Sequence, residues 1–276
     1  MAKQEHNPNA LDLPGINPLS ATLRGWFVLT GFLLLTLPLM PVQFVLLHLA
    51  PSLARRLPHH YHRLVCRLLG IRLKIDGEVV CNKPVLVVAN HVSWIDIPVI
   101  SAVAPISFIA KSEVGKWPFI STLARLQRTV FVDRTRRRDV GKVTSEMGRR
   151  LSQKDALVLF AEGTSTDGNR VLPFKTALFA AAFADDIADV QVQTMSITYT
   201  HLHGIPLGRA DRAHVGWYGD MEMADHAWHL LKAGPIDVNI RIGAPVALSD
   251  FDGRKALAQS TEADVRAEVV RHLRGR

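Results

Sequence analysis

The chain has 276 residues, of which 48% are hydrophobic, and a formal net charge of +8 at pH 7. Its length fits one large domain or a small domain with an appendage. Its charge suits an anionic partner such as a phospholipid surface or a phosphate-bearing substrate. Basic and aromatic residues are not interleaved as in single-strand binders, so we expect no nucleic-acid partner. Cys66 and Cys81 form no disulfide framework or zinc spacing, and we expect buried, reduced thiols.

The N-terminal segment divides into a tail and a long apolar run. Residues 1–20 are polar, contain three prolines and are predicted to form a flexible tail. From Gly25 to Ala54 there is no charged residue, which is long enough for one membrane-crossing helix of about 20 residues. Pro38 and Pro41 interrupt this run, and each removes a backbone donor from a continuous helix.

Three arrangements of the apolar run are open. A helical hairpin can dip into one leaflet, because the part before Pro38 forms a helix of only about 20 Å, too short for a hydrocarbon core of roughly 30 Å. A single kinked helix can span the bilayer instead, and a cleaved signal peptide is the third interpretation. Arg24 and Arg55 flank the run, as expected if both ends face the cytoplasm. We favour the hairpin.

Residues 55–70 combine arginines and histidines with leucines, a pattern that predicts a basic amphipathic helix on an anionic membrane surface. His59, His60 and His62 have no acidic residue close in sequence. We therefore expect histidines at the membrane interface and no metal site. Residues 21–70 are predicted to form a membrane anchor followed by this interfacial helix.

From residue 71 onwards short β-branched runs alternate with longer helical stretches, which predicts one α/β domain over 71–276 with a mostly parallel sheet flanked by helices. The predicted strands are 71–75, 85–89, 106–110, 129–132, 156–160, 190–199 and 236–242. The predicted helices lie near 97–103, 117–126, 136–152, 173–185 and 254–274.

The segment from Asn90 to Asp96 directly follows an apolar predicted strand. Active-site groups of α/β proteins gather at the carboxyl ends of strands, so His91 stands where a general base would stand. On one helix the side chains of His91 and Asp96 would point about 140° apart, so they meet only if His91 lies in a loop before the helix. Ser93 and Asp96 fit a capping box, whereas Pro98 favours a start nearer residue 97. Either way, Asp96 can hold one imidazole nitrogen and leave the other as the base.

Two later segments also follow predicted strands. Residues 160–165 contain Glu162, and a carboxylate at the end of a buried strand is costly unless it is paired. It can hydrogen-bond a hydroxyl-bearing substrate or order the loop, while Gly163 lets the backbone approach a ligand closely. Residues 128–134 end a strand in a mixed-charge pair. This pair is either a solvated surface ion pair, or Arg134 binds an anionic head group.

These three segments, in this order, resemble the signatures of the lysophospholipid acyltransferase family, whose type member makes phosphatidate from 1-acylglycerol-3-phosphate. The resemblance covers roughly residues 70–200, and a lysine often stands in the family where Lys111 follows a strand. The matching residues are His91 and Asp96 in a His-x-x-x-x-Asp block, Phe131 and Arg134 in a Phe-x-x-Arg element, Glu162, Gly163 and Thr164 in a Glu-Gly-Thr element, and Pro173, Phe174 and Lys175 after it.

The resemblance implies a glycerolipid-acyltransferase-like fold and an O-acyltransferase that moves a fatty acyl group from acyl carrier protein or coenzyme A to the hydroxyl of a lysolipid. His91 would take the hydroxyl proton while Asp96 fixes its tautomer, with no metal and no cofactor beyond the acyl thioester. Such an enzyme would sit on the inner (cytoplasmic) membrane with its catalytic domain on the cytoplasmic face. The implied substrate-binding residues are Asn90, Ser93, Lys111, Phe131, Arg134, Glu162, Gly163, Thr164, Arg170 and Lys175.

Two departures from the family pattern concern the acceptor. Ala161 and Ser165 replace the proline and the arginine of Phe-Pro-Glu-Gly-Thr-Arg, and 194–196 read Thr-Met-Ser instead of Val-Pro-Val. Losing a bidentate phosphate ligand weakens the case for a phosphomonoester acceptor. Residues 160–170 are similar to the branch that acylates lyso-ornithine lipid, which is zwitterionic and has no phosphate. Arg170 is the alternative ligand for a phosphate, so both acceptors remain open.

Two other classes of protein compete with this interpretation. A membrane-binding protein with an inactive site would not need an intact His91/Asp96 pair. A lipid hydrolase on the same scaffold would need a nucleophile, but no Gly-x-Ser-x-Gly elbow occurs. Ser93 is the nearest candidate nucleophile.

Overall fold

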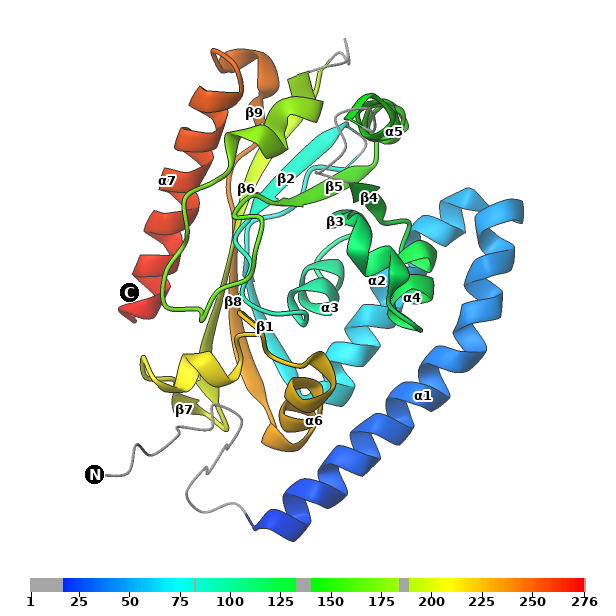
Figure 1. The fold of residues 1–276 in the computed structure, drawn as a ribbon, viewed down its shortest axis with the longest axis vertical. Helices are drawn as coiled ribbons and strands as arrows, with labels where there is room; N and C mark the ends of the chain where they lie inside the picture. Colours follow the sequence, from blue (N-terminus) through cyan, green and yellow to red (C-terminus); the bar gives the residue numbers. More distant parts are fainter. Residues whose placement is uncertain (1–16, 82, 133–139, 184–188, 276) are drawn as a thin grey trace.

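The computed structural model describes residues 17–81, 83–132, 140–183 and 189–275 (Figure 1). Within this part of the chain, seven strands form where the sequence predicts them and two short strands are added. The strands are β1 (Ile71–Asp76), β2 (Val85–Ala89), β3 (Ile106–Lys111), β4 (Val130–Val132), β5 (Ala156–Phe160), β6 (Gln191–Leu202), β7 (Ile205–Pro206), β8 (Ile236–Ile242) and β9 (Val246–Ala247). The α-helices are α1 (Pro18–Leu49), α2 (Pro51–Leu69), α3 (Asp96–Ser101), α4 (Ile120–Leu126), α5 (Val140–Ser152), α6 (Met223–Ala233) and α7 (Arg254–Leu273).

Several helices differ from the prediction. α1 begins at Pro18, inside the predicted tail, of which residues 1–16 lie outside the described residues. The helix predicted near 173–185 is a 3-10 helix at Thr176–Phe183. α6, which covers one end of the sheet beside α1, was not predicted from the sequence.

The strands form one mostly parallel sheet in the order β1-β8-β6-β2-β5-β3-β4. The run from β6 to β4 is parallel throughout, and β1 is parallel to β8. The antiparallel pairings are those of β6 with β8 and with the short strands β7 and β9. This arrangement confirms the predicted α/β fold with a mostly parallel sheet flanked by helices.

The central strands β2 and β5 are buried at every residue, as expected for parallel strands that are covered on both faces. They pair in a register that sets Ala89 opposite Phe160. His91 and Glu162 follow these two residues after one further position each. The two segments that the sequence singled out therefore meet at the same carboxyl edge of the sheet.

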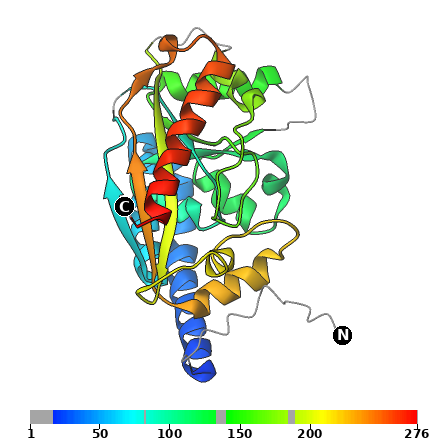
Figure 2. The same cartoon turned by 90° about the vertical axis from the view of Figure 1, so that its left-hand side faces the viewer.

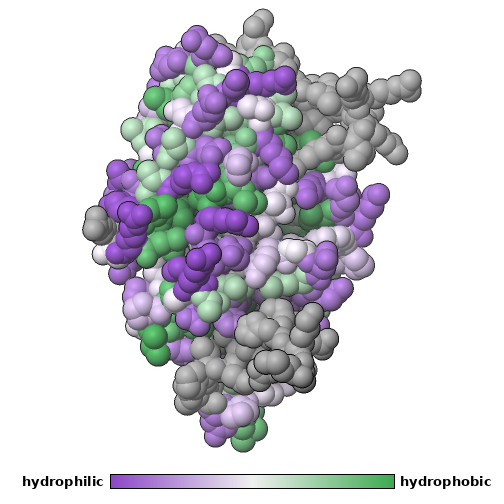
Figure 3. Space-filling view, turned by 60° about the vertical axis from the view of Figure 1, so that its left-hand side comes forward, coloured by the Kyte–Doolittle hydropathy of each residue, from purple (hydrophilic) through white to green (hydrophobic). Residues whose placement is uncertain are grey.

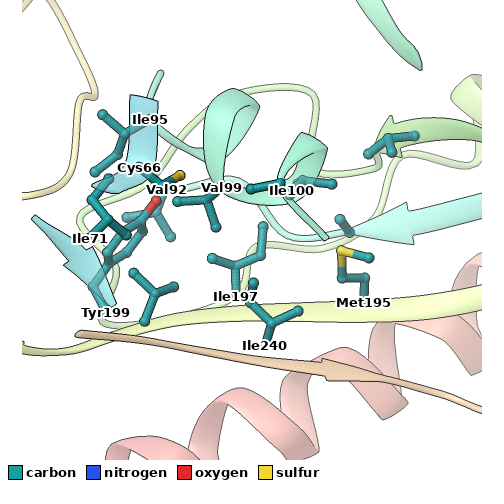
Figure 4. Close-up of a cluster of buried hydrophobic side chains, with 14 of the residues drawn as sticks. Cys66, Ile71, Val92, Ile95, Val99, Ile100, Met195, Ile197, Tyr199 and Ile240 are labelled. Atoms are coloured by element: carbon teal, nitrogen blue, oxygen red, sulfur yellow. The ribbon is translucent and has the colours of Figure 1, made fainter. Parts of the chain in front are cut away.

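Helices cover both faces of the sheet (Figures 1 and 2). α7 packs on β6 on one face, while α3, with α2 and α1 outside it, lies on the other. Each face has its own buried hydrophobic core. Figure 4 shows part of the core on the α3 side, where Val99 and Ile100 of α3 lie over Ile197 of β6 and Ile240 of β8. Because α3 is anchored in this core, its first residue, Asp96, has a fixed position above the sheet.

α1 is one continuous helix of 32 residues, about 48 Å long. It runs through Pro38 and Pro41, so the hairpin turn predicted at these prolines is wrong. The chain reverses instead at Ala50, and Pro51 begins α2 in the first-turn position that proline favours. A helical hairpin does form, but its two arms are α1 and α2 (Figure 1).

One stripe of α1 is docked on the rest of the protein. Thr36 Oγ1 lies 2.8 Å from the hydroxyl oxygen of Tyr61 in α2. Gln43 Nε2 donates to the carbonyl oxygens of Ala54 in α2 and Leu126 in α4, at 2.8 and 2.9 Å. The α1 hairpin arm is therefore held by α2 and α4 as well as by α6. The buried residues of α1 are Gly25, Val28, Thr36 and Gln43.

The opposite side of α1 is apolar and exposed. Among the described residues, α1 is the one helix whose length and composition suffice to cross a membrane. By contrast, hydrophilic side chains are interspersed with hydrophobic ones on the face that Figure 3 shows. An apolar surface on a docked helix fits membrane association. Its exposed large residues are Leu19, Leu23, Trp26, Phe27, Leu33, Leu34, Leu37, Val42, Phe44, Val45 and Leu49.

α2 packs one face against α3, which corrects the prediction for two of its histidines. His59 Nδ1 lies 2.9 Å from the carbonyl oxygen of Ser101, and His62 Nδ1 lies 2.9 Å from the hydroxyl oxygen of the same residue. Burial lowers the pKa of His62 to about 3. These two side chains bind the end of α3 and do not lie on a membrane surface. The exposed polar stripe of α2 consists of Arg56, His60, Arg63 and Arg67.

The two cysteines differ in their surroundings. Cys66 is buried in the α2–α3 interface, where its thiol lies 3.5 Å from the Pro98 carbonyl oxygen, and burial raises its pKa to about 12. Cys81 is exposed. The expectation of buried thiols is therefore correct for Cys66 and wrong for Cys81.

Candidate active site

His91 and Asp96 meet as their spacing predicts. His91 lies in the loop after β2, and α3 begins at Asp96. His91 Nδ1 is 2.7 Å from Asp96 Oδ2, the aspartate side chain is fully buried, and the histidine side chain is 19% exposed. The imidazole stacks on Phe160 with ring centroids 4.0 Å apart. Because Nδ1 is bound to the carboxylate, Nε2 is the nitrogen that can exchange a proton with a substrate.

The Asp96 carboxylate accepts hydrogen bonds from four donors. Oδ2 accepts from His91 Nδ1 and from the backbone N–H groups of Val92 and Ser93, at 2.7 and 3.0 Å. Oδ1 accepts from the Tyr199 hydroxyl at 2.5 Å. Burial first, and then the charge of Asp96, raises the pKa of Tyr199 well above its usual value. The phenol therefore stays protonated and remains a donor, and the network fixes the carboxylate against the imidazole.

The backbone around His91 is held from three further directions. Glu162 Oε1 accepts from the His91 N–H at 2.8 Å. The Thr166 N–H donates to the His91 carbonyl at 3.0 Å, and the Trp217 N–H donates to the Val92 carbonyl at 2.9 Å. Functional groups whose supporting residues are locked in this way need no rearrangement before they react.

Glu162 orders two loops. The residue is only 1% exposed, and its second oxygen, Oε2, accepts from the Leu172 N–H at 2.7 Å. Burial raises its pKa to about 7, against the opposing effect of its two backbone hydrogen bonds. Of the two roles that the sequence left open for this carboxylate, substrate binding and loop ordering, the contacts show loop ordering.

A held His–Asp pair at the carboxyl edge of a parallel sheet is suited to base catalysis, and the family follows from comparison with known proteins. A family model described as Acyltransferase matches residues 71–210, which include the pair and the Glu162 loop. The chain belongs to this acyltransferase family.

Relatives of this acyltransferase match it over most of their length. The lyso-ornithine lipid O-acyltransferase of Brucella abortus (strain 2308) is 48% identical over 92% of this chain and 97% of its own. The enzyme of the same name from Rhizobium meliloti (strain 1021) is 42% identical over 90% and 87%. The 1-acyl-sn-glycerol-3-phosphate acyltransferase of Neisseria meningitidis serogroup B is 31% identical over 77% and 83%.

A solved structure resembles the acyltransferase over nearly the whole chain. The crystal structure of PlsC, the 1-acyl-sn-glycerophosphate (LPA) acyltransferase from Thermotoga maritima, aligns with a TM-score of 0.67 and 25% identity. The alignment covers 94% of this chain and 96% of that one. A likeness of that extent includes helices outside the sheet as well as the sheet itself.

Asn90 and Ser93 of the acyltransferase lie beside the pair, and both are buried. The Asn90 side chain exchanges two hydrogen bonds with the backbone of Ile197, at 2.8 and 3.0 Å, and so ties the end of β2 to β6. The Ser93 hydroxyl has no hydrogen-bond partner among the described residues. The expected capping box is therefore half present, because Asp96 bonds the Ser93 N–H while the serine side chain makes no cap. Substrate binding by these two residues stays a prediction.

Three predicted binding residues are exposed in the segment after β5. Thr164, Arg170 and Lys175 follow the same strand as Glu162 and lie on its carboxyl side. Gly163 adopts a positive φ of 71°, a conformation that glycine adopts without strain and that turns the chain here. Substrate binding by these three residues stays a prediction.

Of the remaining predicted residues, Lys111 belongs to β3 and Phe131 to β4. Lys111 is the exposed last residue of β3. Phe131 lies on the edge strand β4, where the Arg125 guanidinium sits over its ring at 5.5 Å. Phe131 lines a cavity at the α1–α2 turn. Arg134 lies outside the described residues.

Several residues that support the pair were not predicted from the sequence. Tyr199, Thr166 and Trp217 are described above. In addition, Trp94 Nε1 donates to His226 Nδ1 at 3.0 Å, and burial lowers the pKa of His226 to about 4, so the ring is a neutral acceptor. Alternation along β6 places Tyr199 on the same face as Met195 and Ile197. This alternation could have identified Tyr199 as a neighbour of the pair only if β6 was already known to lie next to β2.

Proposed function

We propose that this acyltransferase esterifies the free hydroxyl of a lysolipid with a fatty acyl group from an acyl carrier protein or coenzyme A thioester, and that its acceptor is lyso-ornithine lipid. The observation that carries the reaction type is the imidazole of His91, bound through Nδ1 to buried Asp96 at 2.7 Å. A general base held in this way can activate a hydroxyl without a metal or a further cofactor.

The reaction divides into two proton transfers around one tetrahedral intermediate. His91 Nε2 takes the proton of the acceptor hydroxyl as its oxygen attacks the thioester carbonyl, and Asp96 stabilises the imidazolium that forms. The intermediate collapses with cleavage of the C–S bond. The imidazolium returns its proton to the leaving thiolate, which regenerates the base. No covalent acyl-enzyme is needed.

Ser165 supports an acceptor without a phosphate group. In the family pattern that the sequence resembles, an arginine stands at this position. Here the Ser165 hydroxyl donates to the Trp217 carbonyl, next to the Trp217 N–H that holds the His91 loop. Ser165 therefore braces the site and supplies no positive charge. The relatives at 48% and 42% identity are named for lyso-ornithine lipid, which agrees with this substitution.

A second acceptor, 1-acylglycerol-3-phosphate, is supported by a different residue. Arg170 is exposed in the segment that Glu162 ties to the His91 loop, and a guanidinium is well suited to bind phosphate. The Neisseria meningitidis relative bears the name of that activity. Lyso-ornithine lipid is preferred because relatives with this name have the higher identity over more of the chain.

The membrane arrangement that we propose is a hairpin of α1 and α2 in the cytoplasmic leaflet of the inner membrane, with the catalytic domain on the cytoplasmic face. α1 is docked along its length on α6, α2 and α4. If α1 spanned the bilayer, neighbouring charges such as Lys232, which contacts Gly25, would enter the hydrocarbon core, where they are costly. Insertion of the exposed apolar face alone avoids that cost.

The test is a competition assay with the purified, detergent-solubilised full-length enzyme. Lyso-ornithine lipid and lysophosphatidate are offered together with an acyl thioester, and both ester products are measured. We expect ornithine lipid to predominate, and His91→Ala to lower its formation by about 10²–10⁴. His229→Ala, on the exposed side of α6, is the matched control and should keep full activity. Full activity in His91→Ala would refute the assignment of the base, and a preference for lysophosphatidate would refute the acceptor.

A further inference from the structure

A cavity of about 460 Å³ lies between the α1–α2 turn, α4, β4 and the end of α5. Arg128 lies two residues before β4, and Asp155 directly precedes β5. The cavity thus lies at the amino edge of these parallel strands, whereas His91 follows the carboxyl end of β2. The cavity is therefore separate from the active site, and we call it the arginine pocket.

Two arginines that line the arginine pocket, Arg128 and Arg150, share a buried carboxylate that lies behind the lining. The Asp155 carboxylate, 4% exposed, forms ion pairs through Oδ2 with Arg128 Nη2 at 2.7 Å and with Arg150 Nε at 2.5 Å. The two arginine side chains are 17% and 5% exposed. Arg55 lies 3.6 Å from the same carboxylate. Three guanidinium groups thus share one negative charge. Burial and the nearby charge of Arg150 lower the pKa of Arg128, which agrees with an incompletely neutralised cluster.

The outer wall of the pocket adds to this excess. Arg149 pairs with Glu146 at 2.6 Å and is 55% exposed, and Arg125 lies over the Phe131 ring. The residues that line the pocket carry four guanidinium groups and one carboxylate. Asp155 and Arg55 beside them add one charge of each sign, so an excess of three positive charges remains among the described residues. An uncompensated charge in a partly buried cavity is stabilised by a bound anion.

The apolar side of the pocket identifies the kind of anion. Leu47, Pro51 and Ala54 of the α1–α2 turn line it, and the adjacent Leu49 and Leu53 are 79% and 54% exposed. A site whose interior is cationic and whose rim continues into a membrane-facing helix matches a molecule with an anionic head and an apolar tail. Arginines bind phosphate oxygens through paired N–H donors.

We propose that the arginine pocket binds the phosphodiester head group of an anionic membrane phospholipid, with the lipid chains lying along the apolar α1–α2 turn. This site is distinct from the acceptor site at His91. It does not depend on which lysolipid the enzyme acylates, and it would fix the depth of the α1–α2 hairpin in the bilayer.

The test uses the full-length enzyme and two double variants with equal loss of charge. Arg125→Gln/Arg149→Gln removes two exposed arginines of the pocket and leaves the buried cluster intact. Arg271→Gln/Arg274→Gln is the control on α7. It is closely matched because Arg271 pairs with Glu268 three residues away, as Arg149 pairs with Glu146.

The first measurement is partition onto phosphatidylcholine vesicles with and without phosphatidylglycerol. We expect phosphatidylglycerol to strengthen vesicle binding of the wild type and of the α7 control. In the pocket variant this increase in affinity should be at least roughly tenfold smaller, since each arginine near an anionic surface contributes about 1 kcal/mol. Equal losses in the two double variants would show general electrostatic attraction and overturn the proposal.

The second measurement uses short-chain phosphatidylglycerol below its micelle concentration. Binding to the folded protein should raise the melting temperature of the wild type but not of the pocket variant, and inorganic phosphate alone should have a smaller effect. An equal shift with inorganic phosphate would assign the pocket to a free anion and overturn the lipid.

Activity in neutral detergent micelles separates this proposal from the proposed function. The pocket variant should acylate the acceptor at the wild-type rate there, because its substitutions lie at the edge of the sheet away from His91. A loss of activity with a carrier-protein thioester but not with a coenzyme A thioester would assign the pocket to the acyl donor instead and overturn the proposal.

Discussion

Replacing Tyr199 by phenylalanine tests whether the network around Asp96 serves catalysis or only stability. The substitution keeps the buried ring on β6 and removes one hydroxyl. That hydroxyl donates to Asp96 Oδ1 at 2.5 Å, on the oxygen opposite the one that holds His91. Figure 4 shows Tyr199 beside Val92, whose backbone N–H is another donor to the same carboxylate. Asp96 keeps three donors in the variant.

The expected magnitude follows from the type of bond lost. A hydrogen bond to a charged group contributes about 1.5–3 kcal/mol, so we expect the free energy of unfolding to fall by that amount. If about 1–2 kcal/mol of it acts on the orientation of the Asp96–His91 pair, kcat falls about 5–30-fold. KM for the acceptor should not change, because Tyr199 is buried beneath the pair and its hydroxyl bonds Asp96.

The pH–rate profile distinguishes positioning from packing. Without the tyrosine donor, Asp96 Oδ2 is a stronger hydrogen-bond acceptor for the imidazolium of His91. A change in the electrostatics of this pair alters the pH dependence of kcat/KM, whereas a change in packing alone leaves that dependence as in the wild type. Because the raised pKa of Tyr199 keeps its hydroxyl protonated, we expect its ionisation to make no contribution to the alkaline limb of the wild-type profile.

Tyr61→Phe is the matched control. It also removes one partly buried hydroxyl, whose 2.8 Å contact with Thr36 joins α1 to α2. This hydroxyl makes no bond to the Asp96 carboxylate. We expect a smaller loss of stability, about 0.5–1.5 kcal/mol, and an unchanged pH–rate profile. If Tyr199→Phe loses stability but keeps the wild-type kcat and profile, the bond has a structural role only and the reasoning about Asp96 is refuted.

Two further predictions concern the loop and the hairpin. The raised pKa of Glu162, about 7, exceeds its usual value, so its ionisation destabilises the fold as pH rises from about 4.5 to about 7. In chemical denaturation, the free energy of unfolding of Glu162→Gln should rise relative to that of the wild type by up to roughly 3 kcal/mol between pH 5 and pH 8. A difference between the two proteins that does not depend on pH would contradict the raised pKa. A Cβ at Gly25 would lie 3.0 Å from the Trp228 ring. Gly25→Val should therefore lower the free energy of unfolding by about 1–3 kcal/mol and speed proteolysis of α1. Thr30→Val, on the exposed side of the helix, should change neither.

The sequence predicted that His91 and Asp96 meet, because the evidence for this contact is local. The five-residue spacing of His91 and Asp96 excludes a shared helix, and the apolar strand before them places the loop at a sheet edge. Tyr199 contacts the same carboxylate from 103 residues away. Its role depends on β6 lying next to β2 in the strand order, and a single sequence does not contain that order.

The prolines of α1 show why a local rule gave the wrong turn. A proline inside a helix costs about 3 kcal/mol or more, which predicts a break at Pro38. The helix continues because docked residues lie on both sides of the prolines, Thr36 bonded to Tyr61 and Gln43 bonded to two carbonyls. Tertiary contacts hold the segment straight enough to stay helical, and these contacts are not visible in the apolar pattern.

Contacts of α2 explain why the N-terminal helices and the catalytic domain form one structural unit. His59 and His62 of α2 bind Ser101, the last residue of α3, and the first residue of that short helix is Asp96. Val65 and Cys66 of α2 belong to the same buried core as the central strands. A chain that began at residue 71 would expose this core and free one end of the helix that presents the catalytic carboxylate. In this acyltransferase the helices α1 and α2 are therefore part of the folded unit, and α2 holds the short helix that positions Asp96 against His91.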